Sequence, residues 1–259
     1  FLSTLDSGII NVALPTLSKS FNVDTSLITW SVTLYTLLLT GTIIIFGRLS
    51  DKYSRINIYS IGLIVFLIAS ILCGFSSNVI QLITFRGLQG IGAAMLQGTA
   101  TAIITTSIPE DRQGPALGTL SILLGIGPVL GPSIGGLLIS IGNWRWIFWI
   151  NIPFIFIGLI GSLLLKKYIQ GQKSTSIHLD IRGNFLLFLS ILCLLISLTS
   201  WSSHSIFNIS VYGNFLLFMI VFCLFIVWEL KTNHPIINLH LFKNLSFSAP
   251  IFAIFVFGG

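Results

Sequence analysis

The sequence consists of long apolar runs that carry almost no charge. The stretches 56–85, 113–144, 146–165 and 183–228 contain no Asp, Glu, Lys or Arg. One crossing of a bilayer needs about 20 apolar residues, so each of these runs can hold at least one transmembrane helix. Thirteen basic and seven acidic residues make up only 8% of the chain, whereas soluble domains carry about 25% charged residues. A soluble enzyme, a disordered tail and a secreted disulfide scaffold are therefore excluded.

The apolar runs predict an all-α polytopic membrane protein. We expect crossings near residues 1–17, 27–47, 56–75, 80–106, 115–139, 146–165, 183–200, 211–230 and 247–259. The first and last of these are short for a full crossing. Because the chain has no initiator Met and stops inside an apolar run at Gly259, we expect it to be a fragment of a longer protein, cut at both ends.

The loops divide the predicted crossings into groups. The first six, within 1–165, are joined by short loops and predict one transmembrane bundle. A polar cytoplasmic link, 166–182, leads into a hairpin of two crossings, 183–230. A second cytoplasmic link, 231–246, leads into the last, incomplete crossing, 247–259. No stretch is suited to a soluble domain.

The basic residues predict how the chain is oriented. With the N-terminus on the cytoplasmic side, the cytoplasmic loops hold ten Lys and Arg residues, and the outer loops hold only Lys19 and Arg145. This asymmetry is the positive-inside pattern of a multi-pass protein of the cell membrane. The net charge of +6 therefore does not indicate a nucleic-acid partner. The three cysteines lie in apolar runs and the histidines in or near loops, so we predict no disulfide and no metal site.

Two ionisable residues lie inside predicted crossings, where charge is costly and usually functional. Asp6 lies about 11 residues before the end of its crossing, which places it roughly 16 Å deep. Arg86 lies roughly 10 Å deep in the fourth crossing. One interpretation is a buried structural ion pair. The functional interpretation is that Asp6 binds and releases a proton, with Arg86 as its charged neighbour.

The loop between the second and third crossings concentrates charge. Gly47-Arg48-Leu49-Ser50-Asp51-Lys52-Tyr53-Ser54-Arg55 contains a single acid among basic residues. An ordinary basic cytoplasmic loop is one interpretation. The alternative is a charge clamp, in which Asp51 binds neighbouring arginines or a helix N-terminus. These contacts would break and re-form as two bundles rock. Gly47 would permit close approach of helices.

The fifth crossing combines glycines and prolines. Gly127, Gly131 and Gly135 are four residues apart, which lines one helix face and lets a neighbouring backbone approach closely. Pro128 and Pro132 each remove a backbone donor and favour a bend. Packing explains part of this pattern, but two prolines within about one turn indicate that the bend has a role.

The start of the sixth crossing reads Trp144-Arg145-Trp146-Ile147-Phe148-Trp149-Ile150-Asn151-Ile152-Pro153. Tryptophans at a span boundary are typical of the aromatic belt at a membrane surface. The belt does not explain the Asn151-Ile152-Pro153 segment, which lies inside the crossing.

These motifs together resemble the major facilitator superfamily, and within it the fourteen-helix branch of drug:proton antiporters. The run Leu5-Asp6-Ser7-Gly8-Ile9-Ile10-Asn11-Val12-Ala13-Leu14-Pro15 resembles the family's first-helix motif, with Gly8 where Thr is usual. The loop 47–55 is similar to the family's loop, departing at Ser54, usually glycine, and at Ile56, usually basic. Three further motifs carry the likeness. The fourth-helix motif is matched by Arg86, Gln89, Gly90, Gly92, Ala93 and Ala94, and the fifth-helix motif by Gly127, Gly131, Pro132, Gly135 and Gly136. The third is the segment 144–153 at the start of the sixth crossing, which resembles the fourteen-helix branch in particular.

The resemblance implies an architecture. It implies an N-terminal six-helix bundle, two extra central helices in the hairpin 183–230, and the start of a C-terminal bundle near 247. Substrate would bind near the midplane between the bundles, which would rock to alternate access. The resemblance also implies a transporter that works as a monomer, driven by the proton gradient without a cofactor.

The resemblance assigns roles to residues. Proton-coupled efflux of small, lipophilic, cationic drugs would use Asp6 and Arg86 for coupling and Gly47, Asp51 and Arg55 as a cytoplasmic gate. The fifth-helix antiporter motif would comprise Gly127, Pro128, Gly131, Pro132, Gly135 and Gly136. Candidate residues of the substrate cavity are Asn11, Trp30, Tyr35, Gln89 and Gln97.

Other functions remain open at the level of sequence. The same coupling motifs would serve an exporter of one compound, such as tetracycline, a metabolite or a siderophore. A non-transporting membrane receptor is a remote alternative, because the outer loops are too short for a ligand domain. A membrane enzyme is disfavoured, because no crossing carries a His/Asp cluster, a nucleophile beside a base or metal-ligand spacing.

Overall fold

The computed structural model describes residues 1–166, 180–203 and 209–232, with the single positions 241, 244, 248, 249 and 252. Within these residues the regular structure is helical throughout, and no strand is present. The predicted all-α class is therefore confirmed. The chain separates into two compact units, Phe1–Ile177 and His178–Gly259, and each is described by itself.

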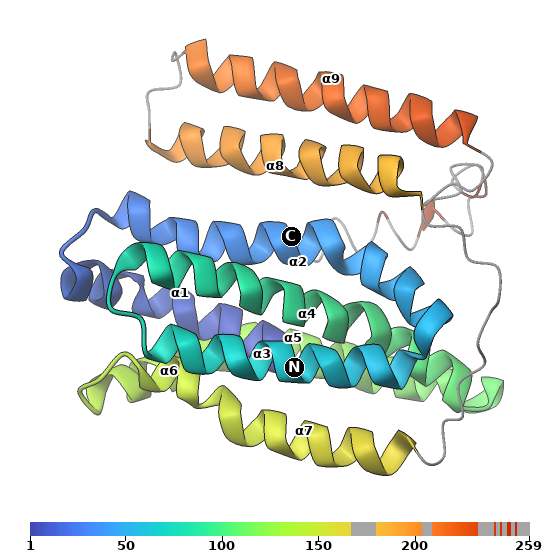
Figure 1. The fold of residues 1–259 in the computed structure, drawn as a ribbon, viewed down its shortest axis with the longest axis horizontal. Coiled ribbons are helices and arrows are strands. Elements are labelled where there is room, and N and C mark those ends of the chain that lie inside the picture. The colour runs from blue at the N-terminus through green and yellow to red at the C-terminus, as the bar shows by residue number, and fades with distance from the viewer. Residues whose placement is uncertain are drawn as a thin grey trace. The chain divides into compact units, whose positions relative to one another are not determined.

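The first unit is a bundle of helices that lie side by side (Figure 1). Its elements are α1 (Leu2–Phe21), α2 (Thr25–Tyr53), α3 (Arg55–Gly74), α4 (Val79–Ser107), α5 (Glu110–Ser140), α6 (Trp146–Trp149) and α7 (Asn151–Lys166). The closest packing joins α4 to both α2 and α3, α1 to α5, and α3 to α7.

The second unit contains the antiparallel pair α8 (Ile181–Ser203) and α9 (Ile209–Lys231). Asp180, just before α8, accepts a hydrogen bond from Trp228 Nε1 at 2.9 Å, which ties the start of α8 to the end of α9. The predicted links 166–182 and 231–246 and the predicted crossing 247–259 lie largely outside the described residues.

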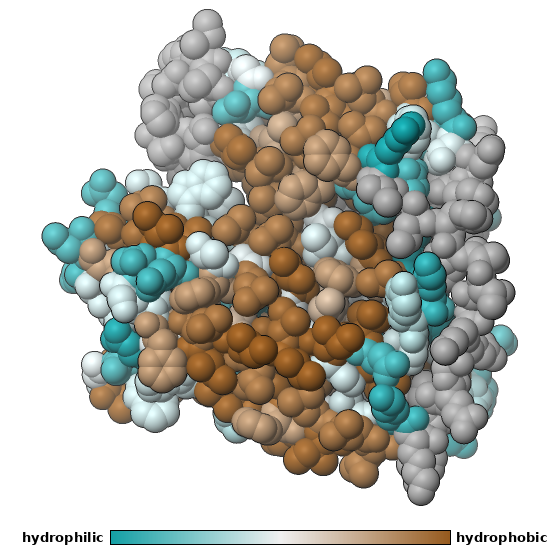
Figure 2. All heavy atoms as spheres, viewed as in Figure 1, coloured by the Kyte–Doolittle hydropathy of each residue, from teal (hydrophilic) through white to brown (hydrophobic). Residues whose placement is uncertain are grey.

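Most of these helices suit a bilayer. Six helical stretches among the described residues are long and apolar enough to cross a membrane, and they lie at Thr25–Tyr53, Arg55–Gly74, Val79–Ser107, Glu110–Ser140, Trp146–Lys166 and Tyr212–Lys231. Large apolar side chains such as Ile61, Ile64 and Ile68 of α3 are exposed along one helix face. In Figure 2, hydrophobic residues cover the middle of the face shown, and hydrophilic residues gather toward its two ends. The exposed apolar surface is what a lipid-facing protein requires.

Several helices extend past the apolar runs that predicted them. α2 continues to Tyr53, through most of the charged loop that was expected to separate two crossings. α5 begins at Glu110, and its acidic first turn is favourable at the positive end of the helix dipole. It then remains one continuous helix through Pro115, Pro128 and Pro132. Hydropathy marks the apolar part of a helix, whereas backbone hydrogen bonding continues into its polar ends.

The predicted crossing 146–165 is interrupted near its start. The helix is interrupted at Ile150, between α6 and α7. Pro153 has no N–H, so the carbonyl of Trp149 cannot receive the usual bond from four residues ahead. The interruption places Asn151 at the first position of α7, where it is fully buried.

Glycines allow α4 to lie close to its neighbours. A Cβ on Gly98 would lie 2.6 Å from the Ile43 carbonyl of α2, and one on Gly92 would lie 2.8 Å from the Phe66 nitrogen of α3. Real Cβ atoms do not approach backbone atoms so closely, so both positions require glycine. This packing holds α4, which carries Arg86 and Gln89, in the centre of the first unit.

Candidate functional site

Asp6 lies at the centre of a buried polar network, and its own hydrogen bonds join α1 to α4 and α7. Its side chain is 2% exposed and accepts hydrogen bonds on both oxygens. Arg86 Nη1 of α4 donates to Oδ2 in a buried ion pair. Gln89 Nε2 of α4 donates to Oδ1 at 3.1 Å, and Asn151 Nδ2 of α7 donates to the same oxygen at 2.8 Å. The structure thus brings together the two ionisable residues that the sequence placed inside crossings.

Arg86 is held by groups from α2 as well as by Asp6. Its guanidinium carbon lies 4.1 Å from the centre of the Tyr35 ring, in a cation–π contact. Nε donates to the Ser31 carbonyl at 3.4 Å, and Nη1 also donates to Gln89 Oε1 at 2.6 Å. A buried charge is tolerated only when it is paired and hydrogen-bonded. Arg86 is paired with Asp6 and bonded through Nε and Nη1, whereas its Nη2 has no hydrogen-bond partner among the described residues.

Gln89 connects the ion pair to α3. Its Nε2 donates to Ser70 Oγ at 3.0 Å, and its Oε1 lies 3.9 Å from the Cys73 thiol. The network therefore spans α1, α2, α3, α4 and α7.

α5 supports α1 on the face beside Asp6. Gly127, Gly131 and Gly135 are all buried. A Cβ on Gly135 would come within 3.1 Å of the Ile9 carbonyl, so the backbones of α5 and α1 are in close contact. The remaining motif residues Pro128, Pro132 and Gly136 are exposed on α5. The predicted glycine face of α5 is thus the surface that packs against α1.

The charged segment 47–55 comprises the last turns of α2, Ser54 and the first residue of α3. Asp51 Oδ1 accepts bonds from Arg55 Nη2 at 2.6 Å and from Arg55 Nε at 2.9 Å. Ser54, between the two helices, has φ 109°, a conformation that favours glycine. Gly47 lies beside α4, where its Cβ would lie 3.4 Å from the Gly98 carbonyl. The clamp residues therefore join α2, α3 and α4 at one end of the unit.

The five candidate cavity residues do not form one group. Tyr35 and Gln89 are buried in the Asp6 network, whereas Asn11 is exposed and Trp30 is half-buried. Gln97 is half-buried, donates to Ser3 Oγ at 2.9 Å, and lines a cavity of about 530 Å³. Ser3, Tyr59 and Thr101 line the same cavity.

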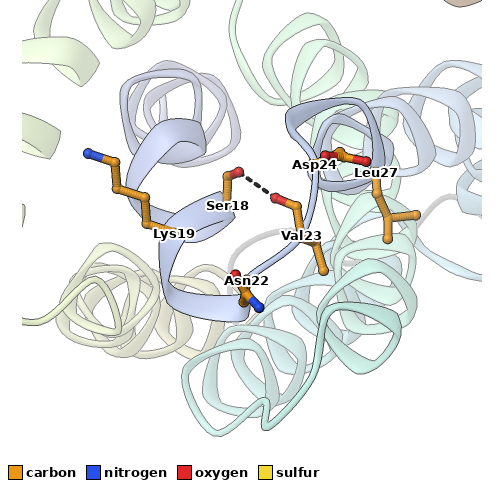
Figure 3. Close-up of a pocket in the computed structure, with 6 residues that line it drawn as sticks. All are labelled: Ser18, Lys19, Asn22, Val23, Asp24 and Leu27. Carbon is orange, nitrogen blue, oxygen red and sulfur yellow. Dashed lines mark hydrogen bonds between the residues drawn. The ribbon is translucent and has the colours of Figure 1, made fainter.

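A second cavity, of about 450 Å³, lies at the turn between α1 and α2 (Figure 3). It is lined by Ser18, Lys19, Asn22, Val23, Asp24 and Leu27. The Ser18 hydroxyl donates to the Val23 carbonyl at 2.6 Å and closes the turn. Lys19 points away from this hydrogen bond in Figure 3.

Four residues of the network, Asn151, Ser31, Ser70 and Cys73, were not predicted as site residues. Asn151 carried the clearest signal, because a polar residue two positions before a proline interrupts an apolar crossing. Ser31 and Ser70 carried little signal, since single serines are common in transmembrane helices and satisfy their own backbone. Their roles depend on how α2, α3 and α4 pack.

Known proteins give an independent comparison. The chain is 38% identical to the riboflavin transporter RibZ of Clostridioides difficile, over 76% of this chain and 42% of that protein. It is 34% identical to the multidrug transporter MdtP of Bacillus subtilis, over 81% of this chain and 39% of that protein. It is 33% identical to the multidrug resistance protein Stp of Mycobacterium tuberculosis, over 74% of this chain and 35% of that protein. The chain thus spans well under half the length of these relatives.

The fold has a counterpart among solved structures. The peptide transporter POT, solved with alafosfalin, superimposes with a TM-score of 0.60 at 16% identity, over 90% of this chain and 50% of that one. At this identity the likeness concerns the fold alone. The sequence model described as Major Facilitator Superfamily matches residues 1–259. Together with the helical bundle and the buried Asp6–Arg86 pair, this match establishes that the chain belongs to the Major Facilitator Superfamily.

Proposed function

We propose that this chain is part of a secondary transporter that exports small lipophilic cations in exchange for protons by alternating access. The observation that supports the proposal most directly is the buried Asp6 carboxylate, bound by Arg86, Gln89 and Asn151. Ionisable residues inside transmembrane helices commonly belong to ion or proton pathways. Two relatives, MdtP and Stp, have multidrug names, which supports drug-like substrates in general.

The proposed coupling uses the two charge states of Asp6. The charged carboxylate pairs with Arg86 and draws α1 toward α4. A proton on Asp6 removes the anion from this pair and weakens the link between the helices. A cationic substrate and a proton would then compete for one negative charge, which is the requirement for exchange. Access to Asp6 from either side would alternate as the bundles rock.

Several properties of the whole protein belong to this proposal. Transport, with no reaction catalysed, would depend on the proton gradient and on no cofactor. The protein would lie in the cell membrane with its N-terminus on the cytoplasmic side, as the distribution of Lys and Arg favours. It would function as a monomer of the fourteen-helix branch, with α8 and α9 as the two extra central helices.

Transport of one specific compound is the second candidate function. The observation in its favour is the 38% identity to a riboflavin transporter. The two candidates share the coupling residues and differ in what the substrate site accepts. Competition between chemically unrelated substrates distinguishes them.

The test is transport by the whole transporter that contains this chain, reconstituted in proteoliposomes. An imposed pH gradient should drive uptake of a lipophilic cation such as ethidium against its gradient, and the cation should in turn move protons. Riboflavin transport without cation transport would favour the second candidate. If the rate of cation uptake is the same with and without the pH gradient, the proposal of proton coupling is wrong.

A further inference from the structure

The first turn of α7 is anchored from two sides by the tryptophans that precede it. Trp149 packs over Gly74 at the end of α3, where even a Cβ would collide with its indole ring. It also packs against Phe75, with ring centres 5.5 Å apart. Trp144 Nε1 donates to Ser20 Oγ of α1 at 2.8 Å. These contacts to α1 and α3 fix the position from which Asn151 reaches Asp6.

Asn151 uses only one end of its amide in the described structure. Nδ2 donates to Asp6 Oδ1 at 2.8 Å, whereas Oδ1 is buried and has no hydrogen-bond partner among the described residues. A buried acceptor without a partner has lost its hydrogen bonds to water and gained none in the protein, which is unfavourable. Such an atom at the centre of the network needs an explanation.

The neighbouring amide of Gln89 is bound at both ends. Its Nε2 donates to Asp6 and to Ser70, and its Oε1 accepts from Arg86 at 2.6 Å. Turning this amide over would place its NH₂ group against the Arg86 guanidinium, donor against donor. Asn151 has no such constraint, because its oxygen has no bond to lose.

We propose that Asn151 is a positioning residue that binds Asp6 in both of its protonation states. With Asp6 charged, the amide donates from Nδ2, as the structure shows. When a hydronium ion gives a proton to Asp6 Oδ1 and leaves as water, the amide turns over about its Cβ–Cγ bond. The hydrogen bond from Nδ2 to Asp6 breaks, and Asn151 Oδ1 accepts a hydrogen bond from the new O–H. No other bond forms or breaks. This inference rests on the proposed function, because it assumes that Asp6 exchanges protons.

The other groups around Asp6 leave this role to Asn151. The titratable side chains that face it are Arg86 of α4, Tyr35 of α2 and Cys73 of α3. Arg86 has no acceptor atom, and Tyr35 already donates its hydroxyl to the Ser3 carbonyl at 3.1 Å. α5 meets α1 through glycines, and α7 carries no charged residue before Lys166.

The experiment is infrared difference spectroscopy between acidic and alkaline pH on the whole transporter in lipid. The carbonyl band of protonated Asp6 is identified as the band that Asp6→Asn removes. In Asn151→Leu, which has a similar shape but no polar atom, this band should move to higher wavenumber, because the acid O–H loses its acceptor. Ser162→Ala, which removes a buried hydroxyl from the same helix, should leave the band in place.

A second measurement needs no variant at position 151. With asparagine carrying ¹³C in its side-chain carbonyl, the wild-type spectrum should contain a label-sensitive amide band that appears with Asp6 protonation and vanishes in Asp6→Asn. If an Asp6 band exists but shows neither the label-sensitive partner nor the shift in Asn151→Leu, this inference is wrong and the proposed function stands. If no carboxyl band depends on Asp6, both are wrong.

Discussion

Gly131 of α5 lies directly on Gly8 of α1. A Cβ on Gly131 would lie 2.5 Å from the Gly8 Cα, and one on Gly8 would lie 3.1 Å from the Gly131 Cα. The two backbones touch two residues away from the buried Asp6. These glycines therefore fix the position of the helix that carries Asp6, the carboxylate that we propose couples transport to protons.

Gly131→Ala should destabilise the bundle because the added methyl group meets backbone, which cannot rotate away. Overpacking of this kind costs about 1–3 kcal/mol, so we expect a lower midpoint of thermal unfolding in detergent and weaker transport. Gly125→Ala is the matched control on the same helix, since a Cβ there meets nothing within 4 Å. Equal stability of the two variants would contradict the close packing of α5 on α1.

Ser54 provides a test in which a substitution is expected to increase stability. Its φ of 109° is unfavourable for a residue with a Cβ and costs about 1 kcal/mol or more. Ser54→Gly should therefore raise the free energy of unfolding by about 1 kcal/mol. Ser54→Ala retains the Cβ and should bring no such gain. A gain of equal size in both variants would show that the backbone conformation is not its source.

The sequence predicted the helices better than it predicted their contacts. Hydropathy located six helices of membrane-spanning length among the described residues, because a bilayer requires an apolar run of fixed length, and one of them, α4, carries Arg86. The predicted first crossing, which carries Asp6, is the helix α1 but is not among the six. Hydropathy could not pair α1 with α5 or α2 with α4, because apolar faces in lipid do not specify a neighbour. Polarity and aromaticity could not show that Asn11 is exposed on α1 and Trp30 half-buried on α2 while Tyr35 is buried in the Asp6 network, because burial depends on which helices pack together.

Asp51 tests the proposed gate. Asp51→Asn keeps the side-chain shape but removes the charge that receives two bonds from Arg55. The pair is partly exposed, so we expect a change of only about 0.5 kcal/mol in stability. Transport should fall by about fivefold or more if the charge also biases a conformational equilibrium by about 1 kcal/mol.

Asp111 supplies the control for the gate. It forms an exposed pair with the adjacent Arg112 at 3.8 Å, and exposed pairs contribute little. Asp111→Asn should therefore transport like the wild type at equal expression. Should Asp51→Asn also transport like the wild type, the gate assignment would be wrong.

Asp6 and Arg86 allow a double-mutant test that separates charge pairing from coupling. Asp6→Asn leaves the fully buried Arg86 without its anion, and removal of one partner of a buried pair costs about 3–5 kcal/mol. Arg86→Gln leaves the carboxylate unpaired and should be similarly costly. The double variant Asp6→Asn/Arg86→Gln removes both charges, so its loss of stability should be smaller than the sum of the two single losses.

Recovery of stability should not restore coupling. Proton-driven export of a lipophilic cation should be absent in Asp6→Asn and in the double variant, because neither retains a carboxyl that can exchange a proton at this position. Asp6→Glu should keep part of the activity, since it moves the carboxyl by about one methylene group.

Asp24→Asn, at the exposed turn before α2, is the control for loss of an acid. Substrate and proton fluxes in proteoliposomes, with membrane insertion checked for each variant, decide the matter. Full coupled transport by the double variant would place the coupling carboxyl elsewhere in the transporter.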